Sequence, residues 1–425
     1  MEKFLMLFRL GIKYLYRYRR RYGFLLIALV FCFSVVSFIT STKDGMYDNV
    51  YFAAQSHYAG DIVAVGFGEY YQIKPDVISA VLEGAKLSGI NPKYTVLRTI
   101  SHYDIIYYNG NSLSLKYLIG CDWENEKHLL SKMDFSSPVI SPLDYDSIIL
   151  STPLAERLGV VVGDSIILEH EADKQKNTGR YIVKGIVNDA SIFGYYKVYI
   201  SRLNMNRLSL YDDDDCTTIG FFFDNHSSAE KKRRTLQNFL SDKLEMGPLV
   251  YDRDGLGEGP GNKLYLLTLP VYLSEVSDLL DAMNLITYFL YGMMLIIIFA
   301  SASVTYRLIL HERAKEMGVM RSIGFFGGDL RLVLWTEVII LGIISLFAGF
   351  LLALVLNFAA SFISFSWFPS FEIFLKNGRL TPIYLFKTVL VNVVFTLLVL
   401  IAAVIFPSMR ASRKNLPSLL SGESL

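Results

Sequence analysis

The sequence predicts a membrane protein with four transmembrane α-helices and a large α+β extracytoplasmic domain inserted between the first and second helices. Three observations predict this architecture. Of the 425 residues, 52% are hydrophobic, and many of these residues collect in four long apolar tracts. A long acidic segment separates the first two tracts, and its pattern mixes helix and strand signals. The short segments before the first tract, between the second and third tracts, and after the fourth tract are basic.

Each apolar tract is long enough to cross a bilayer, which takes about 20 apolar residues in a helix. Residues 22–41, 282–306 and 388–409 carry no charged side chain, and residues 332–371 carry only Glu337. The first tract is followed by no small-x-small cleavage site, so we expect an uncleaved anchor rather than a signal peptide. Four such tracts are not expected of helices buried in a soluble core.

The distribution of basic residues predicts the orientation, because Lys and Arg favour the cytoplasmic flanks of membrane helices. Residues 1–21, 307–331 and 410–425 together hold 15 basic and 5 acidic residues. Residues 42–282 hold 23 basic and 33 acidic residues. We therefore expect both termini in the cytoplasm and the large domain outside.

These patterns divide the chain into nine segments. The first is an amphipathic N-terminal segment, either a helix lying in the membrane interface or a helical extension of the first span. Residues 271–282 are expected to return to the membrane as a helix. The expected boundaries are 1–21 (cytoplasmic N-terminal segment), 22–41 (first span), 42–282 (extracytoplasmic domain), 283–306 (second span), 307–331 (cytoplasmic loop), 332–360 (third span), 361–382 (outer loop), 383–406 (fourth span) and 407–425 (cytoplasmic tail).

Within the large domain, strand and helix signals alternate. Pro75 favours the start of a helix over 74–90, and the Ser151-Thr-Pro153 run favours the start of another that ends near Gly159. Asn109-Gly110-Asn111 is a hairpin signal between strands expected at 96–108 and 113–119. Further strands are expected at 61–66, 147–150, 165–170 and 181–187, and a Gly-rich loop at 252–262.

Three features of this domain invite a metal or disulfide interpretation. Asp212–Asp215 is a run of four acids, for which we expect a solvated loop rather than a calcium site. Glu169-His170-Glu171 precedes a turn-like stretch, so we expect a hairpin tip rather than a metal centre. Cys121 and Cys216 leave both a disulfide and two free thiols open. No metal ligand set is predicted.

The sequence lacks the motifs of an enzyme that hydrolyses nucleotides or peptides. It has no phosphate-binding GxxxxGK[ST] loop, no GxSxG elbow and no HExxH pair. We therefore expect a non-catalytic subunit with no directly bound cofactor and no nucleic-acid partner. Glu337 is the one acid in a membrane segment, where such groups are costly, and we expect it to form a structural ion pair with Arg331 or Arg321.

Residues 312–349, ERAKEMGVMRSIGFFGGDLRLVLWTEVIILGIISLFAG, resemble the hallmark stretch of FtsX/MacB-type (type VII) ABC transporter permeases. That family shows a basic residue, a Glu-x-Gly, an Arg, a small-Gly turn and an acid at the start of the next span. Residues 148–164 and 181–187 resemble the family's periplasmic core domain, and 407–417 resemble its C-terminal end. The matching positions are Arg313, Glu316, Gly318, Arg321, Gly324 and Glu337, with glycines at 342 and 349.

The resemblance implies a coupling helix that docks on a separate ABC ATP-binding subunit, which carries ATP and Mg. A second permease subunit, identical or different, completes the assembly in the bacterial cytoplasmic (inner) membrane. The resemblance also implies that the first two spans continue outward as stalk helices (about 42–58 and 271–283) and that the outer domain moves when ATP is bound and hydrolysed (mechanotransmission). An amphipathic helix over 311–323, with Met317, Met320 and Ile323 on its apolar side, fits the coupling role, because an apolar stripe can enter a partner's groove; a helix lying on the lipid surface is the alternative. The residues assigned to coupling are Arg313, Glu316, Met317, Gly318, Met320, Arg321 and Gly324.

Within that family, the sequence leaves the substrate open. One version resembles LolCE-type permeases that release lipoproteins, and the other resembles MacB-type exporters of peptides or drug-like molecules with a periplasmic adaptor. A non-transporting, FtsX-like regulator of an extracytoplasmic partner is the alternative, and a membrane sensor is another. A sensor would need an intracellular signalling module, for which the cytoplasmic segments are short.

Overall fold

The computed structural model of the chain describes residues 2–17, 19–189, 193–224, 226–251, 261–365, 367, 371–376 and 378–413. The Gly-rich loop expected at 252–262 falls largely outside these residues, and so does the tail beyond 413. The chain divides into a helical unit (1–47, 280–364 and 379–425) and a sheet unit (48–279 and 365–378).

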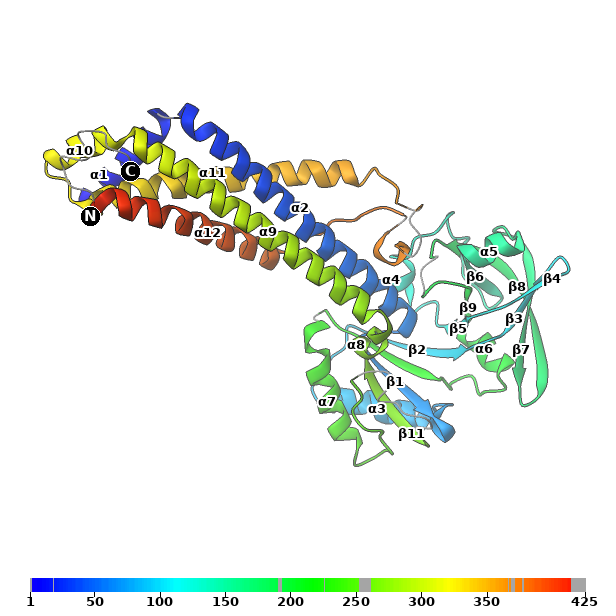
Figure 1. Cartoon of the computed structure of the whole chain (residues 1–425). Coiled ribbons are helices and arrows are strands. Elements are labelled where there is room, and N and C mark those ends of the chain that lie inside the picture. The colour runs from blue at the N-terminus through cyan, green and yellow to red at the C-terminus, as the bar shows by residue number, and fades with distance from the viewer. Residues whose placement is uncertain are drawn as a thin grey trace. The chain divides into compact units, whose positions relative to one another are not determined.

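The helical unit consists of long helices, and four helices of the described chain are long and apolar enough to cross a membrane. The apolar windows lie in 22–58, 277–312, 327–360 and 386–409, so all four predicted spans are confirmed as helices. Figure 1 shows them as the long ribbons. The four spans lie in α2 (Arg19–Tyr58), α9 (Ser274–Glu312), α11 (Gly327–Ala360) and α12 (Phe386–Arg413), and two shorter helices are α1 (Glu2–Arg17) and α10 (Ala314–Ser322).

Two of these helices run farther than the predicted spans. The first span (22–41) and its stalk (42–58) form the single helix α2, and α9 likewise begins at Ser274. A short helix, α8 (Leu269–Tyr272), precedes α9. No Pro or Gly-Gly pair interrupts α2 between Arg19 and Tyr58, so nothing in the sequence breaks the helix where the apolar tract ends.

The spans pack through apolar side chains and one close glycine contact. Leu25, Ile298, Leu341 and Leu400, one from each span, belong to one buried cluster. At Gly349 of α11, an added Cβ would lie 2.8 Å from the backbone oxygen of Val30 in α2. Small residues of this kind let membrane helices approach closely.

A second set of contacts between α2 and the other spans is polar. The Asn357 side-chain amide donates to Ser41 Oγ at 2.8 Å, and Thr42 Oγ1 donates to Asn357 Oδ1 at 3.4 Å. The Asn392 amide donates to Thr40 Oγ1 at 2.9 Å. Side-chain hydrogen bonds between membrane helices contribute about 0.6 kcal/mol each on average, so these contacts orient α2 against α11 and α12 more than they stabilise the bundle.

The sheet unit is built on one mixed sheet with the strand order β11-β1-β10-β2-β5-β9-β6-β8-β7-β3-β4. The pairs β5–β9 and β6–β8 are parallel and the remaining neighbours are antiparallel. The strands are β1 (Ile62–Phe67), β2 (Tyr94–Ser101), β3 (Ile105–Tyr108), β4 (Asn111–Ser114), β5 (Tyr117–Cys121), β6 (Ser147–Ser151), β7 (Ser165–Ala172), β8 (Gln175–Val187), β9 (Lys197–Ser201), β10 (Thr218–Phe222) and β11 (Lys263–Thr268).

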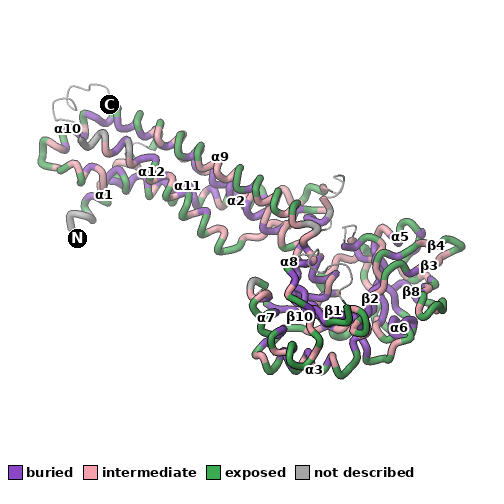
Figure 2. The backbone as a smooth tube through the Cα atoms, turned by 60° about the horizontal axis from the view of Figure 1, so that its bottom comes forward, coloured by how far each residue is buried: buried purple, intermediate pink, exposed green. Residues whose placement is uncertain are grey.

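Two hydrophobic cores divide this sheet into halves. In one half, α3 and α7 cover β1, β10 and β11 through Val81 and Leu236. In the other, α5 and α6 cover β5 to β9 through Leu154 and Met205. Figure 2 shows the central strands as buried and the covering helices as exposed on one side. The helices are α3 (Pro75–Leu87), α4 (Lys127–Leu130), α5 (Thr152–Leu158), α6 (Arg202–Leu208) and α7 (Ala229–Leu240), with 3-10 turns at Gly68–Tyr70, His226–Ser228 and Glu372–Phe374.

Several local predictions are confirmed. Pro75 is the first residue of α3, and α5 ends at Gly159, which has a left-handed φ of 71°. The hairpin turn at Asn109-Gly110 joins β3 to β4. The strands predicted at 96–108 and 113–119 are wrong in extent, because each divides into two. Tyr103 has a φ of 68° and breaks the first run, so β2 pairs with β5 and only β3 pairs with β4.

Candidate coupling site

The helix predicted over 311–323 corresponds to α10 (Ala314–Ser322), which lies between the end of α9 and the start of α11. Its end is set by Gly324, which has a left-handed φ of 105°. The Gly324 amide donates to the Arg321 carbonyl at 3.1 Å, and the Phe325 amide donates to the Met320 carbonyl at 3.1 Å. Hydrogen bonds of this kind are typical of a helix that ends at a glycine. Asp329 then accepts a hydrogen bond from the Phe326 amide at 3.0 Å and starts α11.

Glu337 is paired, but its partner differs from the predicted one. Arg313 Nη1 donates to Glu337 Oε1 at 3.0 Å and to Oε2 at 2.8 Å. Arg331 Nε donates instead to the carbonyl of Gly327, one turn earlier in the same helix. Glu337 and Arg331 are six residues apart on α11, so their side chains leave the helix in different directions. The predicted Glu337–Arg331 pair is therefore wrong.

The Arg313–Glu337 pair is completely enclosed by other residues of the chain. The Glu337 side chain is 0% exposed and that of Arg313 is 3% exposed. The Tyr22 hydroxyl, at the start of the first span, donates to Glu337 Oε2 at 2.5 Å. The Arg313 guanidinium lies 4.4 Å from the centroid of the Tyr14 ring of α1. We call Tyr14, Tyr22, Arg313 and Glu337 the charged joint, because it connects α1, α2, the start of α10 and α11.

The apolar residues assigned to partner docking are also covered by the chain itself. Met317 is 4% exposed and Met320 is 8% exposed. They pack with Leu310, Leu330 and Leu334, and with Leu10, Tyr14 and Phe325 at the margin. Gly318 is buried as well. The sequence showed an amphipathic helix, but its most apolar stripe faces α1 and α11 rather than solvent, so Met317, Gly318 and Met320 do not form an exposed docking surface here.

The opposite side of α10 presents a different set of apolar residues. Val319 is 51% exposed, Ile323 is 74% exposed and Phe326 is 74% exposed. Val319 and Ile323 are four residues apart, so they lie on one side of the helix. We call Val319, Ile323 and Phe326 the exposed α10 patch. The sequence interpretation grouped Ile323 with Met317 and Met320 and missed Val319 and Phe326, because spacing alone does not show which apolar residues the chain itself covers.

The remaining predicted residues flank this patch or fix its position. Glu316 and Arg321 are half-buried, and Glu316 Oε2 lies 3.7 Å from Arg313 Nε. The structure thus brings together Arg313, Glu316 and Glu337. Arg313 is buried, so it positions α10 and is not part of the exposed surface of that helix.

The sheet unit contains a second buried ion pair, at the C-terminal end of α2. Arg98 of β2 donates through Nε and Nη2 to the carboxylate of Glu126, at 3.0 Å and 2.5 Å. Its Nη1 donates to the carbonyls of Ser56 and His57 at 2.6 Å and 3.2 Å. These carbonyls belong to the last turn of α2, where a cation is favoured by the helix dipole. Arg98 therefore fixes the end of α2 to the sheet.

Asp61 forms a second attachment at the same helix end. Its Oδ1 accepts from the Gln55 side chain of α2 at 2.7 Å, and its Oδ2 accepts from the Phe223 amide at 2.8 Å. The Leu269 amide, at the start of α8, donates to the Asp61 carbonyl at 3.1 Å. Tyr58, the last residue of α2, stacks on Tyr272 with ring centroids 4.0 Å apart. The last turns of α2 and the start of α8 are thus both attached at Asp61.

His226 adds a pH-dependent contact to this attachment. Its Nδ1 lies 2.7 Å from Asp61 Oδ1, and this hydrogen bond raises the imidazole pKa above its usual value of about 6.5. The stabilisation is present below that value and is lost as the pH rises through the raised pKa.

We expect the melting temperature of the full chain in detergent to fall by no more than about 2 °C between about pH 6 and pH 8 for this reason. The shift is small because the side chain is 46% exposed. His226→Asn should remove this component of the pH dependence, whereas His311→Asn, at an exposed histidine of α9, should leave it. An unchanged pH profile in His226→Asn would contradict the assignment.

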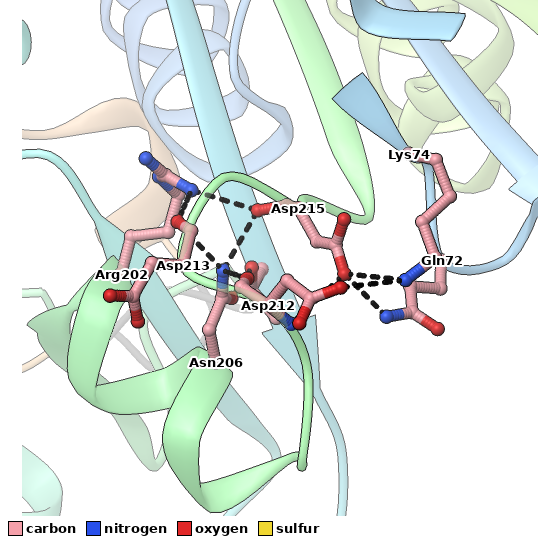
Figure 3. Close-up of polar contacts among 8 residues, drawn as sticks. Gln72, Lys74, Arg202, Asn206, Asp212, Asp213 and Asp215 are labelled. Atoms are coloured by element: carbon pink, nitrogen blue, oxygen red, sulfur yellow. Dashed lines mark hydrogen bonds and ion pairs between the residues drawn. The ribbon is translucent and has the colours of Figure 1, made fainter. Parts of the chain in front are cut away.

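In the acidic run at 212–215, Asp212, Asp213 and Asp214 are exposed, as predicted, but Asp215 is buried, which corrects the prediction for that residue (Figure 3). Asp215 is 0% exposed, and its carboxylate accepts hydrogen bonds from Lys74 Nζ at 2.9 Å and Gln72 Nε2 at 2.5 Å. Arg202 Nη1 donates to the carbonyls of Asp213 and Asp215, each at 2.8 Å. The carbonyls of Asp213 and Asp215 are therefore occupied by the guanidinium of Arg202. The hydrogen bond that Lys74 donates to Asp215 raises the pKa of Lys74.

The two other features considered for metal or disulfide chemistry are structural. His170 lies in β7 with Nδ1 2.5 Å from Asp104 Oδ1, and the hairpin tip follows at Asp173 and Lys174. Within the described residues, no group of three His, Cys, Asp or Glu side chains is arranged to hold a metal ion. Cys121 and Cys216 are buried free thiols, and burial raises the pKa of Cys216 to about 12.

Comparison with known proteins finds a family match within the helical region. Residues 288–416 match the model of the FtsX-like permease C-terminal domain. The crystal structure of the periplasmic region of MacB from Actinobacillus actinomycetemcomitans matches with a TM-score of 0.32 and 10% identity, over 53% of this chain and 96% of that chain. No curated protein matches the sequence. The matched segment contains most of α9, α10, Glu337 and the last two spans, so the similarity to the FtsX-like permease C-terminal domain covers this part of the chain.

Proposed function

We propose that this chain is the permease subunit of an ABC transporter in which a separate subunit hydrolyses ATP and α10 receives the resulting motion. The observation that carries the proposal is the division of α10 into two sides. One side is fixed to α1, α2 and α11 by the charged joint and the Met317 cluster. The other side exposes the α10 patch, in which Val319 and Ile323 have the four-residue spacing of helix anchors that enter a partner's groove.

The charged joint gives a physical route by which a push on α10 reaches the sheet unit. Arg313 begins α10 and shares the Glu337 carboxylate with Tyr22 of α2. α2 continues without interruption to Tyr58, where Arg98 holds its last carbonyls. A displaced α10 therefore moves α2 unless the buried ion pair is broken, which costs several kcal/mol. This connection supports the proposal of mechanotransmission along α2.

The proposal assigns the chemistry to the partner. ATP and Mg bind to the ATP-binding subunit, and this chain contributes no catalytic residue. A second permease subunit pairs with it in the bacterial cytoplasmic membrane. The basic flanks of the spans support the orientation, with α10 in the cytoplasm and the sheet unit outside. The substrate is a lipoprotein to be released or a peptide or drug-like molecule to be exported, with a periplasmic adaptor in the second case.

The test is purification of the tagged full chain from native membranes, followed by mass spectrometry of bound proteins and an ATPase assay. Val319→Asp/Ile323→Asp should weaken recovery of the ATP-binding subunit by roughly thirtyfold, the effect of losing an interface hot spot of about 2 kcal/mol. Val161→Asp, at an apolar side chain of the sheet unit that is 62% exposed, is the matched control.

The outcomes separate the alternatives. Co-purified lipoproteins support release, and a co-purified adaptor supports export. Recovery of an ATP-binding subunit with an extracytoplasmic hydrolase and no transported molecule supports the FtsX-like regulator. Absence of any ATP-binding protein in several detergents would contradict the permease proposal and favour a membrane sensor.

A further inference from the structure

Helix α1 has a surface that the coupling proposal does not use. Its buried side faces the chain itself: Leu7 is 2% exposed, and an added Cβ at Gly11 would lie 3.1 Å from the Thr336 side chain of α11. Away from that side, Phe8 is 37% exposed, Ile12 is 43% exposed and Tyr16 is 72% exposed. These three residues are spaced by four, so they form one apolar stripe along the helix.

A basic stripe runs beside the apolar one. Arg9, Lys13 and Arg17 are also spaced by four, and all three are exposed. Each follows a member of the apolar stripe by one residue, which places the two stripes next to each other around the helix. Arg19 lies 5.2 Å from the Tyr16 ring centroid and extends the positive charge toward α2. One side of α1 is thus apolar and basic together.

Contacts within the helical unit place α1 at the level where the membrane segments begin. Gly11 lies against Val333 and Thr336, the residues just before Glu337. Leu15 packs at the margin of the cluster that contains Tyr22, the first residue of the uncharged segment of α2. Glu337 accepts a hydrogen bond from Tyr22. The exposed stripes of α1 therefore lie beside the first residues of two membrane-spanning helices, at the boundary between lipid and water.

We infer that the exposed side of α1 binds anionic phospholipids, with Phe8, Ile12 and Tyr16 in the acyl region and Arg9 and Lys13 at the headgroup phosphates. An apolar stripe flanked by basic residues is the pattern that this interface favours. Basic residues near an anionic leaflet attract it electrostatically. Continuity with the membrane spans favours a lipid surface over a protein as the occupant.

The bound lipid also has a route to the coupling site. Tyr14 of α1 lies against the Arg313 guanidinium, and Leu10 and Tyr14 border the cluster that holds Met317 and Met320. A change in how deeply α1 sits in the interface therefore changes the packing beneath α10. This consequence rests on the proposed function, whereas lipid binding itself does not.

The test uses the full chain without any ATP-binding partner, so its failure is distinct from failure of the coupling proposal. A nitroxide is attached at Ile12→Cys, because the three native cysteines are buried. Its accessibility to oxygen and to a water-soluble nickel chelate is measured in two nanodiscs. One contains phosphatidylglycerol with phosphatidylcholine, and the other contains phosphatidylcholine alone. Immersion in lipid, with the nickel chelate excluded, is expected in the anionic disc.

Arg9→Glu/Lys13→Glu should weaken the association of α1 with the anionic disc on the order of tenfold, which raises nickel accessibility there more than in the neutral disc. Arg9→Lys/Lys13→Arg keeps the charge and should behave as the parent does. Lys174→Glu/Arg180→Glu makes the same charge change at exposed residues of the β7–β8 hairpin and should have no effect.

Three results would overturn the inference. The first is a label at position 12 that is open to the nickel chelate in the anionic disc. The second is a label that is shielded from both reagents, which would indicate a protein partner or a second copy. The third is equal accessibility in the charge-reversed and parent chains, at low salt and in the anionic disc.

Discussion

Glu337→Ala is expected to destabilise the helical unit by about 3–5 kcal/mol, the usual cost of removing one partner from a buried ion pair. The loss is large because Arg313, 3% exposed, would remain charged and enclosed beside Tyr14 and Tyr22. The measurement is thermal unfolding of the purified full chain in detergent. The quantity measured is the fraction of protein that stays monodisperse after heating. Tyr22→Phe removes one hydrogen bond and should cost only about 1–2 kcal/mol.

Two control variants make this prediction specific. Arg331→Ala removes an arginine from the same helix that does not pair with Glu337, and it should have a small effect. Arg313→Met/Glu337→Leu removes both charges and should recover much of the loss, because apolar replacement of a buried pair is often neutral. If Glu337→Ala melts at the same temperature as Arg331→Ala, the charged joint does not hold the bundle.

Arg98→Ala is expected to loosen the end of α2 and destabilise the sheet unit, again by about 3–5 kcal/mol. The variant leaves the Glu126 carboxylate, 3% exposed, without its cation. It also leaves the carbonyls of Ser56 and His57 without their donor. Hydrogen–deuterium exchange of the full chain should show faster exchange in the last turns of α2 than in β6 or β9.

A neighbouring surface pair provides the control for Arg98. Lys127 and Glu124 also form an ion pair, at 2.6 Å, but their side chains are 68% and 79% exposed. Lys127→Ala should cost less than about 1 kcal/mol, because water screens the exposed pair. Equal effects of Arg98→Ala and Lys127→Ala would show that Arg98 does not fix the helix end.

The spans were predictable because lipid solvation imposes one requirement on each of them. A membrane helix needs about 20 apolar residues whatever its neighbours are, and the tracts at 22–41 and 388–409 met it in the sequence. Capping rules were equally local, so Pro75 and Gly159 marked helix ends correctly. The full length of α2 was not predicted as one helix, since its polar second half has no apolar signal.

The side of α10 that faces outward was not predictable from spacing. Met317 and Met320 are as apolar as Val319 and Ile323, and only the positions of α1 and α11 decide which pair is covered. The partner of Glu337 was missed for a similar reason. Arg313 is 24 residues away, across a turn whose geometry depends on Gly324, and sequence proximity favoured Arg331. Asp215 looked solvated because its partners, Gln72 and Lys74, are distant in sequence.

Photo-crosslinking from the exposed α10 patch is a direct test of whether α10 contacts an ABC ATP-binding subunit. A benzophenone amino acid at position 323 is irradiated in native membranes, and the same amino acid at Val161 serves as the control. We expect a crosslink from position 323 to an ABC ATP-binding subunit, which mass spectrometry would identify. The yield of this crosslink should change when ATP is added. Crosslinks only to lipid, or to the same proteins from both positions, would contradict the assignment of α10 as the coupling helix.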